Sequence, residues 1–102
     1  MPIRGFKTAS ERADHFDRHV TRAREFNFAD VLEYEAAAIE FMNKAVDGVI
    51  IEEDARARDG TVIRFDCNTN EICFVDVDEF ITTYFKVRCA NPYAYFERTL
   101  ER

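Results

Sequence analysis

The sequence contains only two histidines, His15 and His19, and they stand four positions apart. In a helix, residues at this spacing lie on the same face, so the two imidazoles would be neighbours. Because the ordinary pKa of histidine is close to neutral, such side chains can take up and release protons at physiological pH. The pair is therefore the first candidate for acid–base chemistry in this chain.

Two other interpretations of the histidine pair remain open. It could be a surface pair without a role. A metal site is less well supported, because two histidines supply only two ligands and no third ligand is evident nearby. The H-E-x-x-H pattern of zinc proteases is absent, since Phe16, Asp17 and Arg18 separate the histidines. We therefore expect neither a metal nor another cofactor.

A second candidate is the segment of residues 81–87, ITTYFKV, which is rich in hydroxyl and aromatic side chains. In a strand, alternate side chains point to opposite faces, so Thr83 and Phe85 share one face and Lys86 lies on the other. A hydroxyl beside an aromatic ring can hydrogen-bond a phosphate and stack a base, although ordinary strand composition gives the same pattern. Arg64 is a third, weaker candidate. It is a charge in the middle of a predicted strand, and we expect it to lie on a face outside the core.

Two helices are expected to carry and support the histidines. The first should begin near residue 9, because Thr8 and Glu11 fit a capping box, and it should end near residues 24–26. The second is expected after Asp30, with Glu33 at the third position of the helix. Because the link between them is short, we expect the two helices to pack as an antiparallel pair.

After residue 48, the pattern changes to short runs that are typical of strands. Residues 49–51 are β-branched, and residues 52–60 are typical of a charged loop. Three strands with tight connections are expected, over residues 61–66, 71–77 and 79–87. Asn91 followed by Pro92 predicts the start of a last helix. The sequence thus predicts an α+β fold, with two N-terminal helices packed on a small antiparallel β-meander and a short C-terminal helix.

The composition is that of one ordinary domain, and we expect residues 1–102 to share a single core. The chain is 47% hydrophobic, but no run is long enough to span a membrane and no apolar stretch of a secretion signal is present. Three cysteines, Cys67, Cys73 and Cys89, lack C-x-x-C spacing. Cys67 and Cys73 could approach one another across a turn, but small buried thiols are the better interpretation.

The charge of the chain argues against general binding to nucleic acid. The net charge is −6, and residues 31–60 hold eight acidic against three basic side chains. Attraction to phosphate is the main sequence-independent part of nucleic-acid affinity, so an acidic chain lacks it overall. An enzyme with a locally basic cleft remains compatible with this composition.

Four features of the sequence occur in a characteristic order. They are an H-x-x-R-H helix at residues 15–19, a capped helix beginning DVLEYEAA at 30–37, a strand and turn RFDCNTNE at 64–71, and a T-x-F-K strand at 83–86 followed by a helix containing Tyr95 and Phe96. In this order and spacing, they resemble the barnase–EndoU–colicin–RelE-like ribonuclease superfamily. The most similar branch is the phage and polymorphic-toxin group, which includes tRNA-cutting toxins.

The resemblance implies metal-free cleavage of RNA, in which the 2′-hydroxyl attacks the adjacent phosphate and leaves a 2′,3′-cyclic end. His15 and His19 would match the paired histidines of the family, and Thr83 would match the hydroxyl of its last strand, which completes the catalytic set. The substrate contacts implied in the same way are Arg18, Arg64, Phe85 and Lys86.

The implied partners are RNA, with tRNA among the candidates, and an immunity or antitoxin protein that neutralises the enzyme; no membrane partner is expected. Its site of action would be the cytoplasm, reached by delivery if the chain is a toxin. The alternative is a non-catalytic interaction or inhibitor protein on the same scaffold, whose acidic middle segment would engage a basic surface. An unrelated small domain is the third option.

Overall fold

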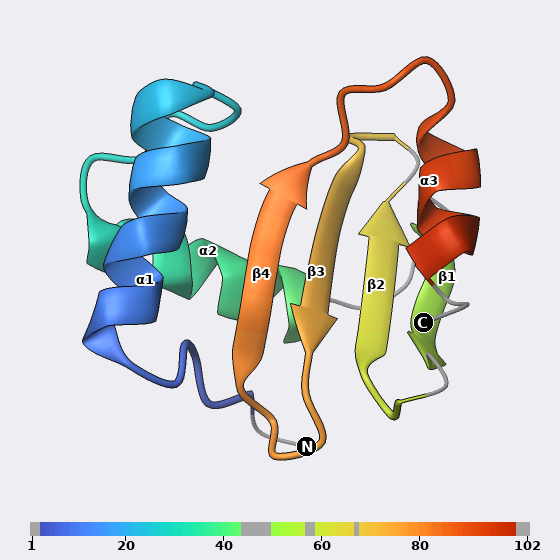
Figure 1. Cartoon of the computed structure of the whole chain (residues 1–102), viewed down its shortest axis with the longest axis horizontal. Helices are drawn as coiled ribbons and strands as arrows, with labels where there is room; N and C mark the ends of the chain where they lie inside the picture. The colour runs from blue at the N-terminus through green and yellow to red at the C-terminus, as the bar shows by residue number, and fades with distance from the viewer. Residues whose placement is uncertain (1–2, 44–49, 57–58, 67, 100–102) are drawn as a thin grey trace.

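The computed structural model describes residues 3–43, 50–56, 59–66 and 68–99. Within these ranges, two helices precede a four-stranded sheet, and a third helix follows it (Figure 1). The elements are α1 (Ala9–Phe16), the π-helical turn η1 (Asp17–Arg22), α2 (Val31–Asn43), β1 (Ile50–Arg56), β2 (Val62–Asp66), β3 (Glu71–Val75), β4 (Ile81–Lys86) and α3 (Pro92–Thr99). This is the α+β class that the sequence predicts.

All three α-helices begin at the capping residues expected from the sequence. In each, a side-chain oxygen accepts a hydrogen bond from the backbone N–H three positions later: Thr8 from Glu11 at 3.0 Å, Asp30 from Glu33 at 2.9 Å and Asn91 from Ala94 at 3.1 Å. These bonds satisfy N–H groups that have no partner within the helix itself.

The described strands form one antiparallel meander in the order β1-β2-β3-β4. The predicted meander is confirmed, with one strand more than expected. The interpretation of residues 52–60 as a loop is wrong for residues 52–56, which belong to β1 and pair with β2 through two register shifts. β1 lies at the edge of the sheet, where charged sequence is common, and it lacks the alternation that identifies a half-buried strand.

The connection between β3 and β4 shortens both strands relative to the prediction. Oδ1 of Asp76 accepts hydrogen bonds from the backbone N–H groups of Asp78 at 2.9 Å and Phe80 at 3.0 Å. Glu79 adopts a left-handed conformation with φ of 72°. A turn organised by an aspartate in this way competes with strand pairing, so β3 ends at Val75 and β4 begins at Ile81.

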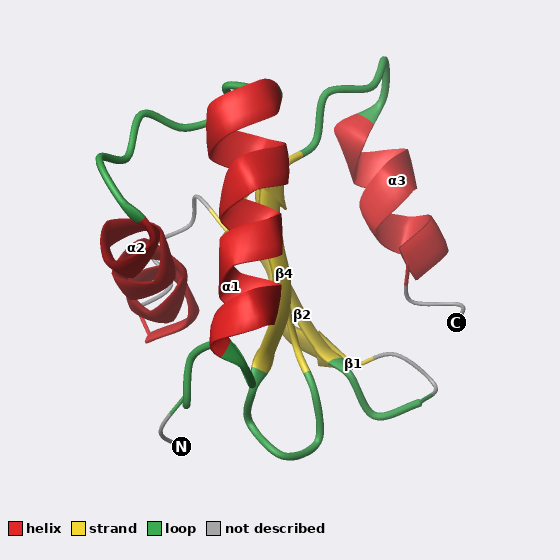
Figure 2. Ribbon diagram, turned by 60° about the vertical axis from the view of Figure 1, so that its left-hand side comes forward, coloured by secondary structure: helices red, strands yellow, loops and turns green. Residues whose placement is uncertain are grey.

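The sheet separates two hydrophobic clusters. Figure 2 shows α2 and α3 on opposite sides of the sheet, with α1 beside β4. On the α2 side, the cluster contains Phe6, Tyr34, Ala38, Phe41, Met42, Cys73, Val75, Ile81 and Tyr84. On the α3 side, it contains Ile63, Phe65, Ile72, Phe74, Val87 and Phe96. Because side chains alternate along a strand, Tyr84 faces α2 whereas Thr83 and Phe85 face the other way.

The first two helices do not form the expected antiparallel pair. In both Figure 1 and Figure 2, α2 runs across the direction of α1. The reason lies in residues 23–30, which connect η1 to α2. Phe26 stacks on Tyr84 with ring centroids 4.8 Å apart, and the ring centroids of Phe28 and Tyr34 are 6.0 Å apart. These rings hold the link against the core, so α2 starts across the sheet and not alongside α1.

Two of the cysteines lie within the described residues. Cys73 is buried and free, as expected, whereas Cys89 is free but exposed, so the expectation of a buried thiol is wrong there. Cys67, and with it the possible approach to Cys73, lies outside the described residues. None of the helices described is both long enough and apolar enough to cross a lipid bilayer.

Candidate functional site

The helix that carries the histidines changes its geometry where His19 lies. Residues Asp17–Arg22 form a π-helical turn, and the N–H of Ala23 donates to the carbonyl of Arg18 at 3.0 Å. The N–H of Glu25 then donates to the carbonyl of His19 at 2.9 Å. Such turns are rare and occur frequently at functional sites. The sequence predicts one continuous α-helix here, because the apolar spacing does not reveal the wider turn.

The chain leaves this turn through a residue in an uncommon conformation. Arg24 has φ of 54°, in the left-handed region that non-glycine residues rarely adopt. Arg88, which follows β4, donates from Nη1 to the carbonyl of Ala23 at 2.8 Å and from Nη2 to the carbonyl of Arg24 at 3.0 Å. A cation at the carbonyl end of a helix is favourable, so Arg88 fixes the end of the turn beside β4.

Both histidines lie within a row of stacked rings that reaches from the N-terminal segment to β4. The centroid separations are 5.5 Å from Phe6 to His15, 5.9 Å from His15 to His19 and 5.2 Å from His19 to Phe85. The interplanar angles are between 14° and 25°. The expected proximity of the two imidazoles is confirmed, and the stacking leaves only their edges for hydrogen bonds.

His19 is buried, and its polar partner is Glu25, which the sequence pattern did not single out. Nδ1 of His19 lies 3.1 Å from Oε2 of Glu25, with side-chain exposures of 11% and 9%. Oε1 of the same carboxylate accepts the backbone N–H of Lys86 at 2.7 Å. A carboxylate only accepts, so Nδ1 of His19 carries the proton in this contact and Nε2 is left for chemistry.

His15 is half-buried and faces Thr83 of β4. Nδ1 of His15 lies 3.4 Å from Oγ1 of Thr83, at the long end of a hydrogen bond. Burial lowers the pKa of His15 below its ordinary value of 6.5, and the nearby Arg18 and His19 act in the same direction. Asp14 and Glu11 oppose the shift. The neutral imidazole is therefore favoured, and a neutral imidazole is the form that accepts a proton.

Arg18 lies on the exposed side of the helix, close to His15. Its Nη2 forms an ion pair with Oδ2 of Asp14 at 2.8 Å, and both side chains are more than half exposed. Exposed pairs of this kind contribute little stability, so a phosphate can replace Asp14 at little cost. Arg18 thus remains compatible with the role that the sequence resemblance implies.

Phe85 and Lys86 are adjacent in β4 but serve different sides of the strand. Phe85 ends the ring row against His19 and also contacts Tyr95 of α3. The Nζ of Lys86 lies 5.4 Å from the ring centroid of Phe26. The structure therefore places Phe85 with the histidines, and it places the ammonium of Lys86 with the residues that follow η1.

Arg64 lies away from the histidines, and the expectation that it lies outside the core is wrong. It is 3% exposed, and its Nη1 donates to the carbonyl of Phe41 in α2 at 3.0 Å. In the sheet register, Arg64 pairs with Cys73 and Cys73 with Tyr84, so all three face α2. Thr83 faces the other side. The strand pattern around Arg64 gives no sign of this partner, because the carbonyl of Phe41 belongs to a helix that is distant in the sequence.

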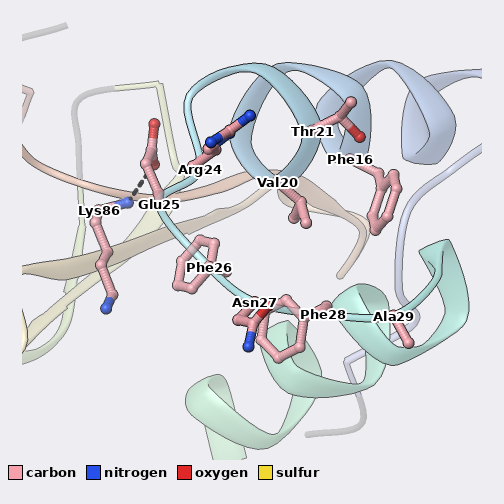
Figure 3. A pocket seen from close by; sticks show the side chains of 10 residues that line it. All are labelled: Phe16, Val20, Thr21, Arg24, Glu25, Phe26, Asn27, Phe28, Ala29 and Lys86. Atoms are coloured by element: carbon pink, nitrogen blue, oxygen red, sulfur yellow. Dashed lines mark hydrogen bonds between the residues drawn. The ribbon is translucent and has the colours of Figure 1, made fainter.

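A hollow of about 820 Å³ adjoins the Glu25–His19 pair (Figure 3). It lies between η1 and residues 26–29, and Glu25 forms part of its wall. Phe16, Phe26 and Phe28 supply aromatic surface, and the remaining lining comes from Val20, Thr21, Arg24, Asn27, Ala29 and Lys86. Figure 3 also shows the hydrogen bond from the backbone of Lys86 to Glu25 as a dashed line.

Comparisons with known proteins assign the chain to no family. No protein-family model matches the chain, and a search of curated proteins finds no match. Within the described ranges, no group of three or more His, Cys, Asp or Glu side chains is placed to hold a metal ion. The candidate site therefore contains two histidines with different partners, the carboxylate of Glu25 and nearby cations.

Proposed function

We propose that this chain is a metal-independent endoribonuclease in which His15 and His19 transfer the protons. One observation carries the proposal: two stacked imidazoles are held by different partners, His15 beside Thr83 and His19 against Glu25. Catalysis by an acid and a base needs two groups that can transfer protons within one site, and the two imidazoles supply them beside different partners.

His15 is assigned the role of general base. Its lowered pKa favours the neutral ring at neutral pH. In the tautomer in which Nδ1–H donates to Oγ1 of Thr83, Nε2 holds the lone pair that accepts a proton. His15 would take the proton from a ribose 2′-hydroxyl as its oxygen attacks the adjacent phosphorus.

His19 is assigned the role of general acid. The Glu25 carboxylate holds the ring through Nδ1, so Nε2 is the nitrogen that would give a proton to the 5′-oxygen that leaves. The bond from phosphorus to the 2′-oxygen forms and the bond to the 5′-oxygen breaks. The products are a 2′,3′-cyclic phosphate and a free 5′-hydroxyl, and Arg18 would balance the charge that develops on the phosphate.

The test is incubation of the purified chain with total tRNA in EDTA, followed by separation of the fragments and analysis of their ends. Discrete fragments with cyclic phosphate ends are expected. His15→Ala and His19→Ala should each lower the rate by about 10²- to 10⁴-fold, the usual contribution of acid–base catalysis. Cleavage that is unchanged in both variants would contradict the proposal.

Adjacent threonines of β4 provide a matched control for the geometry. Thr83→Val removes the hydroxyl that faces His15 and should lower kcat by roughly 2- to 10-fold, the value of one hydrogen bond. Thr82 is exposed, and its hydroxyl donates to the carbonyl of Phe74 at 3.3 Å, so Thr82→Val should leave kcat unchanged. A wild-type chain that is inert towards RNA but binds a basic protein would support the non-catalytic alternative instead.

A further inference from the structure

The hollow beside Glu25 has the size and position of a substrate pocket. Its volume of about 820 Å³ lies within the range of roughly 300–1,000 Å³ that is typical of small-ligand sites. It shares Glu25 with the histidine site, because Oε2 of this carboxylate contacts His19. A group bound in the hollow would therefore lie one side chain away from His19.

The walls of the hollow match the chemistry of a nucleobase. Phe16, Phe26 and Phe28 present flat apolar surface, and single-stranded bases are commonly bound against such rings. Asn27 and Thr21 add an amide and a hydroxyl that can recognise the edge of a base. The lining thus combines shape for a planar ring with groups that can distinguish one base from another.

Two cations at the hollow lack a carboxylate partner among the described residues. Each of three other arginines near this part of the chain forms an ion pair: Arg12 with Glu35, Arg18 with Asp14 and Arg22 with Asp17. In contrast, no ion pair involves the guanidinium of Arg24 in the described part of the chain, and the Nζ of Lys86 rests against the ring of Phe26. In a chain with a net charge of −6, both of these cations line one hollow.

We propose that this hollow binds one unstacked nucleotide of single-stranded RNA beside the cleaved bond, with the base among the phenylalanines and its phosphate on Arg24. This inference rests on the proposed ribonuclease function and names its substrate class. A base within a duplex cannot enter such a pocket without leaving its stack, so loops and unpaired ends are the substrates. Lys86 adds a second positive charge to the lining.

The experiment measures binding without cleavage, using a single-stranded RNA oligonucleotide whose 2′-hydroxyls are methylated, in EDTA. Because a neutralised phosphate releases counterions, the slope of log K against log salt for a single strand changes by about 0.7 for each phosphate that is no longer neutralised. Arg24→Gln should flatten the slope by about this amount and weaken binding at low salt by roughly 5- to 10-fold. The matched control is Arg22→Gln, which removes a cation two residues away that is paired with Asp17 and does not line the hollow. It should leave both quantities unchanged.

A second variant separates recognition of the base from recognition of the phosphate. Asn27→Ala should weaken binding for some base sequences and not others, with the salt slope unchanged, because a neutral amide releases no counterion. Asn27 is exposed, so this variant tests the pocket without disturbing the core.

The outcomes distinguish this inference from the proposed function. If Arg24→Gln and Arg22→Gln give the same slope and affinity as the wild type, while unmodified RNA is still cut, the nucleotide pocket is refuted and the ribonuclease stands. If Arg24→Gln alone flattens the slope but unmodified RNA is never cut, the pocket stands and the ribonuclease is refuted.

Discussion

Oε2 of Glu25 lies 3.1 Å from Nδ1 of His19, while Oε1 of the same carboxylate accepts the backbone N–H of Lys86. One side chain therefore joins the end of η1 to β4 and also orients an imidazole. Both partners are about nine-tenths buried, so the contact is protected from competing water and salt. The position of His19 against the sheet depends on this carboxylate.

Glu25→Gln is expected to lower both stability and activity. The amide keeps the shape of the side chain but removes the charge from two buried hydrogen bonds, which should cost about 1–3 kcal/mol in the free energy of unfolding. Urea denaturation measures this cost, and the cleavage rate at equal folded fraction measures the effect on His19. Glu33→Gln, at an exposed position of α2, is the control. Equal stability and activity in the two variants would show that Glu25 orients nothing.

The lowered pKa of His15 predicts how stability depends on pH. Between the folded pKa and the ordinary value of 6.5, the unfolded chain binds more protons than the folded chain, so stability rises with pH in this window. The contribution is fully present above the unfolded value and is lost as the pH falls towards the folded value. His15→Asn should remove this part of the dependence in urea denaturation at a series of pH values. A variant with the wild-type pH dependence would contradict the assignment.

The same pKa predicts the acid limb of catalysis. If neutral His15 is the base, kcat/KM should rise with pH and level off once the pH exceeds a pKa below 6.5. Because Arg18 lowers the pKa of His15 and Asp14 raises it, Arg18→Gln should move this limb to higher pH and Asp14→Asn should move it to lower pH. Opposite movements of the two variants are the result to look for. Movement of both in one direction would exclude His15 as the group that titrates.

The features predicted correctly from the sequence are those that local chemistry determines. The caps at Thr8, Asp30 and Asn91 depend on residues three positions apart, so their patterns are visible in the chain. The stack of His15 on His19 follows in the same way from helical spacing. The strand β1 was missed because its pairing with β2 is non-local and its sequence is too charged to show alternation.

The parts of the site that the sequence did not reveal depend on chain reversal or on distant elements. Glu25 reaches His19 only because a π-helical turn and a left-handed Arg24 bring the chain back on itself. Arg64 was assigned to the substrate because its position in a strand says nothing of Phe41, whose carbonyl it binds across the sheet. Nothing in the local pattern of either residue indicates its partner.

Tyr34→Phe should reveal how much one buried hydrogen bond contributes where α2 meets the sheet. The hydroxyl of Tyr34 donates to the carbonyl of Tyr84, and its ring packs among Phe6, Phe26 and Phe28. The variant keeps the ring and removes the donor, so a loss of about 1 kcal/mol in the free energy of unfolding is expected. Tyr93→Phe, on α3 with 37% exposure, should change stability by less than about half as much. Denaturation curves for the two variants that coincide would contradict this role for Tyr34.

Arg64→Met tests whether this buried arginine is structural. Methionine fills similar space but cannot donate to the carbonyl of Phe41, whose place near the end of α2 favours a cation. The free energy of unfolding should fall by about 1–3 kcal/mol. Arg98→Met, on the exposed face of α3, should leave it nearly unchanged. At equal folded fraction, the salt slope of RNA binding should match that of the wild type, because a guanidinium that is 3% exposed cannot contact the phosphate of a bound RNA. A flatter salt slope with unchanged stability would instead show that Arg64 contacts the RNA.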